Sequence, residues 1–346
     1  MAAARKRSPL STAFSIALQR SFRRVNNGPL YLGIDCSAYT TSLALVDGEE
    51  RLLWERRRQL PVRHGARGLR QSEALFAHIQ NLPEMWEEGA SFLKCAPLAA
   101  VAAAVKPRPL SHSYMPVFKV SETAGTLIAQ TLGCSFFAYS HQEGHLAAGL
   151  WSAGLPPGRC LAVHLSGGTT EILAVDGREP ARLQIERRGG GSDLHAGQFV
   201  DRIGVAMGLP FPAGPALERC ARRGETGAIK LPVAVQGTEI SFSGPESQAQ
   251  RLLEQGAGRC DLARAVEICI ADSLSAALLA VADIHSFAAV LVVGGVAANT
   301  FIRDRLRQKC PKKTFHFASP AFSRDNAAGL AVLAARKVRE EIKEKR

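Results

Sequence analysis

Two histidines and an aspartate are the residues of this sequence best suited to metal chemistry. His141 and His145 stand four residues apart, the spacing that puts two side chains on one face of a helix. Imidazoles at this spacing suit Zn²⁺ or Fe²⁺, and a later carboxylate would complete a two-histidine, one-carboxylate set with open positions for substrate. Asp325 is the candidate for that carboxylate. The alternative is an ordinary polar patch on a helix.

The acidic residues near these histidines do not fit a metallopeptidase. The pattern H-E-x-x-H needs a glutamate directly after the first histidine, and H-x-x-E-H needs one directly before the second. Here Glu143 comes two residues after His141, and Gly144 precedes His145. Peptide hydrolysis is therefore not expected.

Two glycine-containing turns have the composition of phosphate-binding loops. The first lies between two apolar runs, and its free N–H groups suit phosphate oxygens, although it also reads as a simple tight turn. Its residues are Ser166, Gly167, Gly168, Thr169 and Thr170. The second is Gly294-Gly295, which leads through Asn299 into an expected helix. Two such turns in opposite halves of the chain, with Asp35 in an earlier hairpin, predict a nucleotide clamped between two domains.

A third polar segment runs from Ser192 to Asp201 and includes Gly197. Asp193 is expected at a helix N-terminus, where it would act as the cap or contact a ligand. Asp201 lies about two turns further on. It either accepts hydrogen bonds from a ribose or faces solvent.

The elements that must position these residues show a repeated plan. Apolar runs Tyr31–Asp35 and Thr40–Val46 read as a strand pair, and Cys160–Leu165 and Glu171–Val175 read as a second pair of the same kind. Helices are expected over 71–88, 120–132 and 264–282, and strands over 98–105, 134–139 and 288–293. The repeat predicts two similar α/β domains with mixed sheets flanked by helices. We expect the first domain to comprise residues 29–146 and 318–346 and the second to comprise residues 147–317.

Length and composition narrow the class of protein. The 346 residues suffice for two ordinary domains, and no apolar run of about 18 residues predicts a membrane span. Eight scattered cysteines without a C-x-x-C pair indicate free thiols in a reducing compartment, which predicts a cytoplasmic protein. Together with the lack of a long apolar run, this predicts no membrane partner.

The formal net charge of +12 leaves a polyanionic partner such as RNA open. Residues 1–28 supply half of it and contain no acidic residue. This segment is interpreted as a basic, disordered extension, and the alternatives are contact with nucleic acid, contact with a membrane, or a transit peptide. A second basic group lies between Arg51 and Arg70.

Seven motifs, in this order, resemble those of the tRNA threonylcarbamoyladenosine transferase family, formerly called the O-sialoglycoprotein endopeptidase or glycoprotease family, within the actin-like ATPase superfamily. The likeness extends from about Tyr31 to Lys337. The matching segments are Gly33–Ser37, His141–His145, Ser166–Thr170, Asp193–Asp201, Ser241–Gly244, Gly294–Asn299 and Asp325–Ala328.

The resemblance implies two actin-like, RNase H-like domains with the active site in the cleft between them. It also implies transfer of a threonylcarbamoyl group from threonylcarbamoyl-adenylate to the adenosine next to the tRNA anticodon, with Asp35 and Ser166 as catalytic residues. The implied metal ligands, for Fe²⁺ or Zn²⁺, are His141, His145 and Asp325. The implied binding residues for ATP or the adenylate are Ser166, Gly167, Gly168, Thr169, Asp193, Gly197, Asp201, Gly294, Gly295 and Asn299.

The chain departs from the family pattern at four places, which makes it resemble a divergent paralogue. One is Lys106–Pro116, which is unlike the glycine-rich segment of the family. Tyr39 and Thr40 stand where the family carries an Asp-Glu pair, Thr169 replaces a histidine, and Pro245–Ser247 replaces Leu-Lys-Thr. Two alternatives follow: a carbamoyltransferase acting on a small molecule, and a non-catalytic, nucleotide-binding scaffold subunit of a tRNA-modification complex. A homodimer or a pairing with a paralogous subunit is expected from the family alone.

Overall fold

The computed structural model describes residues 28–61, 69–179, 181–281 and 286–346. The predicted basic extension lies almost wholly outside these residues. The chain divides into two compact units, one comprising residues 1–148 and 325–346 and the other comprising residues 149–324. None of the described helices is both long and apolar enough to cross a membrane.

The first unit is built on a five-stranded mixed sheet with the order β3-β2-β1-β4-β5. β1 pairs antiparallel with β2 and parallel with β4, so the predicted hairpin is confirmed. The elements of this unit are β1 (Leu30–Cys36), β2 (Thr40–Asp47), β3 (Leu52–Gln59), α2 (Gln71–Ala90), η1 (Ser91–Lys94), β4 (Leu98–Lys106), α3 (Phe118–Leu132), β5 (Ser135–Ser140), the start of α4 (His141–Ser152), and α10 (Ala328–Glu344).

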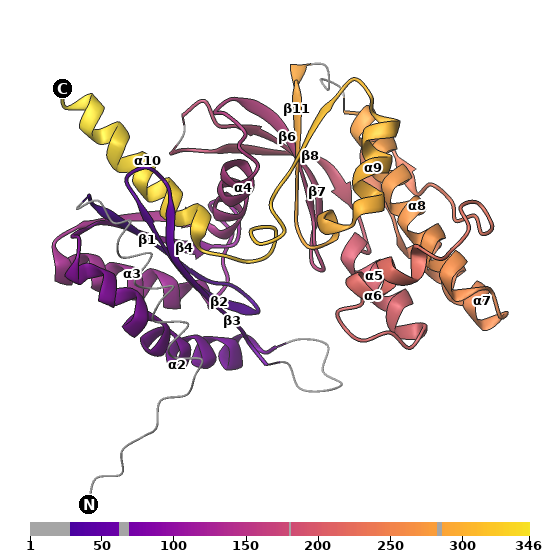
Figure 1. Ribbon diagram of the computed structural model, residues 1–346, viewed down its shortest axis with the longest axis horizontal. Coiled ribbons are helices and arrows are strands. Elements are labelled where there is room, and N and C mark those ends of the chain that lie inside the picture. Colours follow the sequence, from indigo (N-terminus) through magenta and orange to yellow (C-terminus); the bar gives the residue numbers. More distant parts are fainter. Residues whose placement is uncertain (1–27, 62–68, 180, 282–285) are drawn as a thin grey trace, which may run out of the picture. The chain divides into compact units, whose positions relative to one another are not determined.

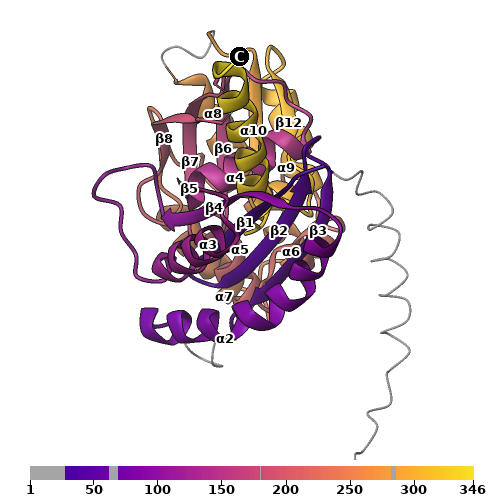
Figure 2. The ribbon, with the colours of Figure 1, turned by 90° about the vertical axis from the view of Figure 1, so that its left-hand side faces the viewer.

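Helices cover both faces of this sheet. Figures 1 and 2 show α2 and α3 on one face and α10 on the other. Side chains alternate along a strand, so Leu32 and Ile34 of β1 join the core beneath α2 and α3, while Gly33 faces α10. A Cβ at Gly33 would overlap the backbone of Ala327 and Ala331, so this glycine allows α10 to lie directly on the sheet.

The second unit repeats this plan within a larger sheet, whose order is β12-β11-β6-β7-β8-β10-β9. β6 pairs antiparallel with β7 and parallel with β11, as β1 does with β2 and β4. The elements are β6 (Arg159–Leu165), β7 (Thr170–Asp176), β8 (Gln184–Gly191), α5 (Ala196–Ala206), α6 (Gly214–Ala221), β9 (Val235–Gln236), β10 (Glu239–Ile240), α7 (Ser243–Glu254), α8 (Arg259–Leu279), β11 (Ala289–Val293), η3 (Val296–Ala298), α9 (Thr300–Lys309) and β12 (Thr314–Phe317).

The predicted fold class, with two mixed sheets flanked by helices, is confirmed. Gly133 ends α3 in the left-handed conformation, as its position after the apolar run predicts. α8 begins at Arg259 rather than at Arg264. The charged residues Arg259 and Asp261 interrupt the apolar pattern there, although Leu262 in the same turn is buried.

Candidate metal and nucleotide sites

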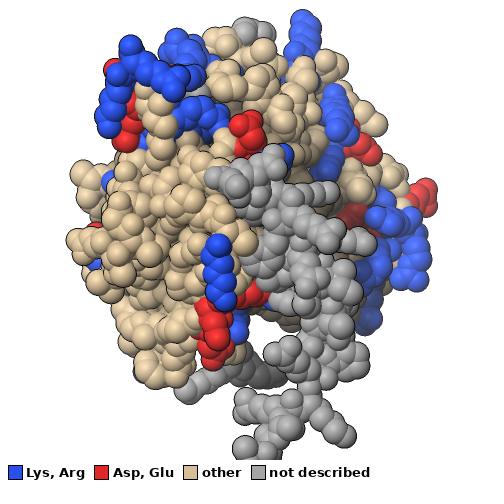
Figure 3. Space-filling view, turned by 60° about the vertical axis from the view of Figure 1, so that its left-hand side comes forward, with Lys and Arg blue, Asp and Glu red and all other residues tan. Residues whose placement is uncertain are grey.

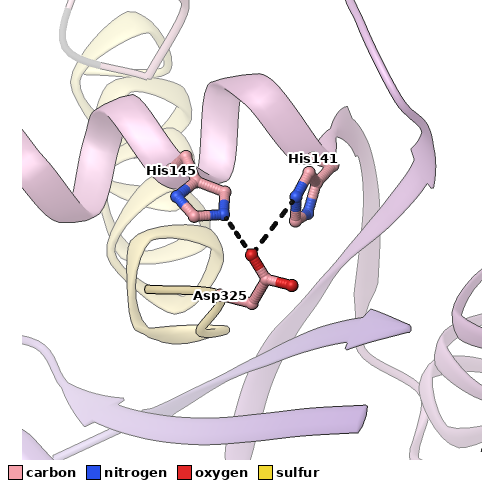
Figure 4. Close-up of side chains that lie close together, drawn as sticks. All are labelled: His141, His145 and Asp325. Carbon is pink, nitrogen blue, oxygen red and sulfur yellow. Dashed lines mark hydrogen bonds and ion pairs between the residues drawn. The ribbon is translucent and has the colours of Figure 1, made fainter. Parts of the chain in front are cut away.

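His141, His145 and Asp325 meet within the first unit. Nε2 of His145 lies 3.0 Å from Oδ1 of Asp325, and Nε2 of His141 lies 3.8 Å from the same oxygen. The three ligand atoms all lie within 4.8 Å of one another. Figure 4 shows both imidazoles projecting from α4 toward the carboxylate, which lies just before α10. The side chains thus converge as the metal interpretation requires.

The start of α4 is held by a capping box. The carboxylate of Glu143 accepts hydrogen bonds from N–H and Oγ of Ser140, at 2.7 and 2.6 Å, and the N–H of Glu143 donates to Oγ of Ser140 at 3.2 Å. Glu143 is therefore a helix cap, which agrees with the argument against a peptidase. The cap fixes His141 in the first turn and His145 one turn later.

Glycines bring α4 against α10. A Cβ at Gly329 would overlap the carbonyl oxygen of Gly144, and one at Gly144 would crowd Leu330. Only small residues permit this approach, which brings the chain just before α10, with Asp325, under the histidines.

Two further side chains hold the metal candidates in place. Oδ2 of Asp35, a residue only 1% exposed, lies 2.6 Å from Nδ1 of His141. This contact leaves Nε2 of His141 to face Asp325. Oγ of Ser37 donates to Oδ2 of Asp325 at 2.7 Å. Ser37 was not predicted as a site residue, although it directly follows β1 and its spacing of two from Asp35 would put both side chains on one face if the extended backbone continued.

The charges of the cluster shift two pKa values. Burial lowers the pKa of His141, but the charge and hydrogen bond of Asp35 and the charge of Asp325 outweigh it and raise the pKa to about 9. Burial raises the pKa of Asp325, but the hydrogen bond from His145, the charges of both imidazoles and the Ser37 hydroxyl hold it well below its usual range. A carboxylate that stays ionised among imidazoles is ready to bind a cation.

The donor set fits a divalent transition metal. Two imidazole nitrogens and one carboxylate oxygen are the ligands that Zn²⁺ and Fe²⁺ take in sites with open positions. The carboxylate of Asp35 behind His141 is the arrangement that orients a metal-binding imidazole and raises its basicity.

In the second unit, the predicted turn from Ser166 to Thr169 closes the β6–β7 hairpin. The N–H of Ser166 donates to the carbonyl of Thr169 at 2.8 Å, and the N–H of Gly168 donates to Oγ of Ser166 at 3.3 Å. Gly167 and Gly168 are exposed, with open space where a Cβ would lie. The turn therefore offers accessible backbone to a ligand.

The N-terminus of α5 packs against this turn. The N–H of Ala196 donates to Oγ1 of Thr170 at 2.8 Å, and that of Gly197 donates to the carbonyl of Ser166 at 3.2 Å. A Cβ at Gly197 would overlap the turn backbone, so this position needs glycine. An exposed turn of two glycines beside a helix N-terminus is a feature of many anion sites.

Gly294 lies beside the same turn. It has a φ of +100°, and a Cβ there would overlap the carbonyl of Leu165, next to Ser166. The two glycine turns therefore follow neighbouring parallel strands, β6 and β11, within one unit. The expectation that they lie in opposite halves of a clamp is wrong, because parallel pairing brings segments distant in sequence to one sheet edge.

The two aspartates of the third segment have structural partners. α5 begins at Ala196, so the expectation that Asp193 sits at its N-terminus is wrong by three residues. Asp193 instead accepts hydrogen bonds from the hydroxyl of Ser241 and from the N–H of Phe242, which tie it to the start of α7. Oδ1 of Asp201 accepts the N–H of Ala213 at 2.7 Å, which fixes the loop before α6.

Asn299 is the N-cap of α9. Its Oδ1 accepts the N–H of Ile302 at 2.9 Å, and its Nδ2 donates to Oε1 of Glu267 at 2.6 Å. Glu267 is almost fully buried and pairs with Arg264 at 2.6 Å. Burial, only partly offset by Asn299 and Arg264, raises the pKa of Glu267 to about 7. Sequence reasoning missed Glu267, because an acidic residue within an apolar helix carries no motif.

Four of the basic residues between Arg51 and Arg70 form ion pairs with neighbouring acids. The ion pairs, at 2.6 to 2.8 Å, are Arg51–Asp47, Arg56–Glu88, Arg57–Glu55 and Arg58–Glu84. Arg63 and Arg67 lie outside the described residues. On the face shown in Figure 3, basic side chains stand in separate groups with acidic ones among them.

Comparison with known families and curated proteins gives consistent matches. A family model described as tRNA N6-adenosine threonylcarbamoyltransferase matches residues 66–332. A protein of that name from Thermus thermophilus is 32% identical over 311 residues, which cover 88% of this chain and 92% of the relative. Another, from Prochlorococcus marinus, is 32% identical over 278 residues, covering 74% of this chain and 75% of the relative.

Solved structures with the same arrangement of elements have unrelated names. HypF from T. kodakarensis matches with a TM-score of 0.59 at 15% identity, covering 91% of this chain and 48% of that one. The activator of 2-hydroxyisocaproyl-CoA dehydratase from Clostridium difficile, solved with bound ADPNP, matches with a TM-score of 0.54 at 14% identity, covering 91% and 97%. At this identity the likeness shows the fold alone, which is the actin-like ATPase fold.

Proposed function

We propose that this chain, which belongs to the tRNA N6-adenosine threonylcarbamoyltransferase family, transfers a threonylcarbamoyl group from threonylcarbamoyl-adenylate to an adenosine of tRNA. In this reaction the adenosine N6 amine attacks the carbamoyl carbonyl carbon. The bond from that carbon to the phosphate oxygen breaks, adenylate leaves, and the attacking amine loses a proton. The same membership supports a transferase rather than a peptidase.

The residues of the first unit would hold the metal. His141, His145 and Asp325 supply the donor atoms, with Asp35 orienting His141 and Ser37 orienting Asp325. An Fe²⁺ or Zn²⁺ ion bound there would act as a Lewis acid on oxygens of the threonylcarbamoyl-adenylate. In this proposal Asp35 acts through His141, because its carboxylate is buried and bonded to that imidazole.

The residues of the second unit would hold the adenylate or ATP. The exposed turn at Gly167 and Gly168, with the N-terminus of α5 behind it, suits the phosphate. The fold neighbour solved with ADPNP supports a nucleotide ligand. Asp201 and Asn299 would act by holding the loop before α6 and the start of α9, since both carry internal hydrogen bonds.

The convergence of the metal candidates carries this proposal. Asp325 is separated from His145 by 180 positions in sequence, yet the ligand atoms lie within 4.8 Å and the imidazoles face the carboxylate. A chain retained only as a scaffold would have no need of this convergent and oriented donor set.

Nucleoside mass spectrometry on tRNA tests the function. Unmodified tRNA is incubated with the full chain, synthetic threonylcarbamoyl-adenylate, and Zn²⁺ or Fe²⁺, and then digested to nucleosides. Threonylcarbamoyladenosine should form with the natural protein and not with Asp325→Ala. If none forms although the protein binds ATP, the chain is a nucleotide-binding scaffold or acts on another acceptor, and the proposal fails.

A further inference from the structure

Two cysteines of the second unit lie with their sulfur atoms in direct contact. Sγ of Cys220, near the end of α6, is 2.8 Å from Sγ of Cys260, in the first turn of α8. Both thiols are free. A disulfide bond is about 2.05 Å long, so less than about 1 Å of movement would join them. Among the described residues, no other pair of cysteines shows a sulfur–sulfur contact of this kind.

The backbones around the two cysteines are packed tightly together. A Cβ at Gly224 would overlap the carbonyl of Cys260, and the N–H of Glu225 donates to Oδ1 of Asp261 at 2.8 Å. The segment after α6 therefore lies against the start of α8, which keeps the backbones of the two cysteines close together. The pair is held in position by its surroundings.

The two thiols differ in access and in charge environment. Cys220 is 7% exposed, whereas Cys260 is partly exposed. Burial and the neighbouring Cys260 sulfur raise the pKa of the Cys220 thiol, and the Arg223 guanidinium opposes this shift. Because thiol exchange requires a thiolate that an oxidant can reach, Cys260 is the sulfur to react first.

We propose that Cys220 and Cys260 form a redox modification site that closes to an intramolecular disulfide when a small disulfide oxidant is present. The thiolate of Cys260 attacks one sulfur of the oxidant, which releases one thiol and leaves a mixed disulfide on Cys260. Cys220 then loses its proton and attacks the Cys260 sulfur, which releases the second thiol. Two protein thiols are oxidised, and one molecule of oxidant is reduced to two thiols.

The bond would tie together the two helices that hold the start of α9. Glu218 of α6 accepts hydrogen bonds from the N–H and Oγ1 of Thr300, at 3.1 and 2.6 Å. Glu267 of α8 accepts one from Asn299. The disulfide-bonded form would therefore stabilise the contacts that hold Asn299. It would also be more stable against unfolding, since a cross-link restricts the unfolded chain. This inference does not rest on the proposed function.

Peptide mapping after oxidation tests the site. The full chain is treated with oxidised glutathione at mildly alkaline pH, its remaining thiols are alkylated, and the digest is analysed by mass spectrometry. We expect a peptide pair joined through Cys220 and Cys260, lighter by two hydrogens and released by a reductant. The Cys269→Ser control, in the same helix, should still form it. If the natural chain stays folded after oxidation but gives no such peptide pair, or forms disulfides mainly between other cysteines, the proposal is overturned.

Two variants test the order of the steps. In Cys220→Ser the glutathione adduct should accumulate on Cys260, because the thiol that resolves it is missing. In Cys260→Ser the adduct on Cys220 should form more slowly, because Cys220 is buried. Oxidation should raise the melting temperature of the natural chain and of neither variant. A rise that persists in both variants overturns the assignment to this pair.

Discussion

At the scale of single residues, the sequence predicts the metal ligands but not their supports. The i, i+4 spacing predicts that His141 and His145 share a face, and the family resemblance points to Asp325. The contacts of Asp35 with His141 and of Ser37 with Asp325 could not be predicted, because each joins positions brought together only by the sheet and α10. The roles of all these residues in metal binding stay predictions.

Asp35 should contribute to metal affinity through His141. Asp35→Asn removes the charge that raises the basicity of the imidazole, so the affinity for Zn²⁺ should fall about 10-fold to 100-fold. Competition with a chromophoric chelator measures this at about pH 9, where about half of the His141 imidazoles are unprotonated and proton competition lowers the affinity only about twofold. Asp176→Asn, the same change in the other unit, should have no effect. Equal affinity in Asp35→Asn and the natural chain would contradict the assigned role.

The raised pKa of His141 predicts how metal binding depends on pH. With a pKa of about 9, the imidazole of the metal-free protein carries a proton at neutral pH, and that proton must leave before a metal binds. The apparent Zn²⁺ affinity should therefore rise with pH, by up to about tenfold per unit, and level off near pH 9. The rise should be shallower in Asp35→Asn. A flat profile in the natural chain would show that His141 is not a ligand.

At the scale of elements, strands with apolar runs and helices with clear ends could be predicted, and elements with polar surfaces could not. β3 could not be predicted from an apolar pattern, because its second half contains three arginines. Two of them, Arg56 and Arg58, pair with glutamates of α2. The side-by-side placement of the two glycine turns follows from strand order, which local sequence does not encode.

Gly294 and Gly295 are neighbours in the turn after β11, and the structure requires glycine at the first position but not at the second. Gly294 has a φ of +100° and no room for a Cβ, so Gly294→Ala should lower the free energy of unfolding by about 2 kcal/mol or more. Gly295 has helical backbone angles and open space, so Gly295→Ala should change it by less than about 0.5 kcal/mol. Chemical denaturation of both variants checks this. Equal stabilities would contradict the described packing.

At the scale of the whole molecule, the repeated strand pairs predict two similar domains, and both sheets share the order seen in β3-β2-β1-β4-β5 and β8-β7-β6-β11-β12. The predicted family is also confirmed. The net charge is a weaker guide to the partner of the protein, because several of the basic residues that suggest RNA binding form ion pairs within the chain.

The proposed tRNA substrate, together with the net charge of +12, predicts salt-sensitive binding of tRNA. Each phosphate contact releases counterions, so the affinity should fall at least about tenfold between about 50 and 200 mM salt. Fluorescence titration of unmodified tRNA with the full chain measures the slope. Binding that is equally tight at both salt concentrations would show that phosphate contacts do not drive the association.

The central claim is that this chain is a threonylcarbamoyl transferase that works through the metal held by His141, His145 and Asp325. The most direct measurement titrates chelator-treated protein with Zn²⁺ or Fe²⁺ and records bound metal and threonylcarbamoyladenosine in the same samples. Threonylcarbamoyladenosine should rise in proportion to bound metal and stop rising at one ion per chain. The His145→Ala variant should bind no metal and form no threonylcarbamoyladenosine. Product formed at full rate without bound metal, or none at full occupancy, would contradict the account.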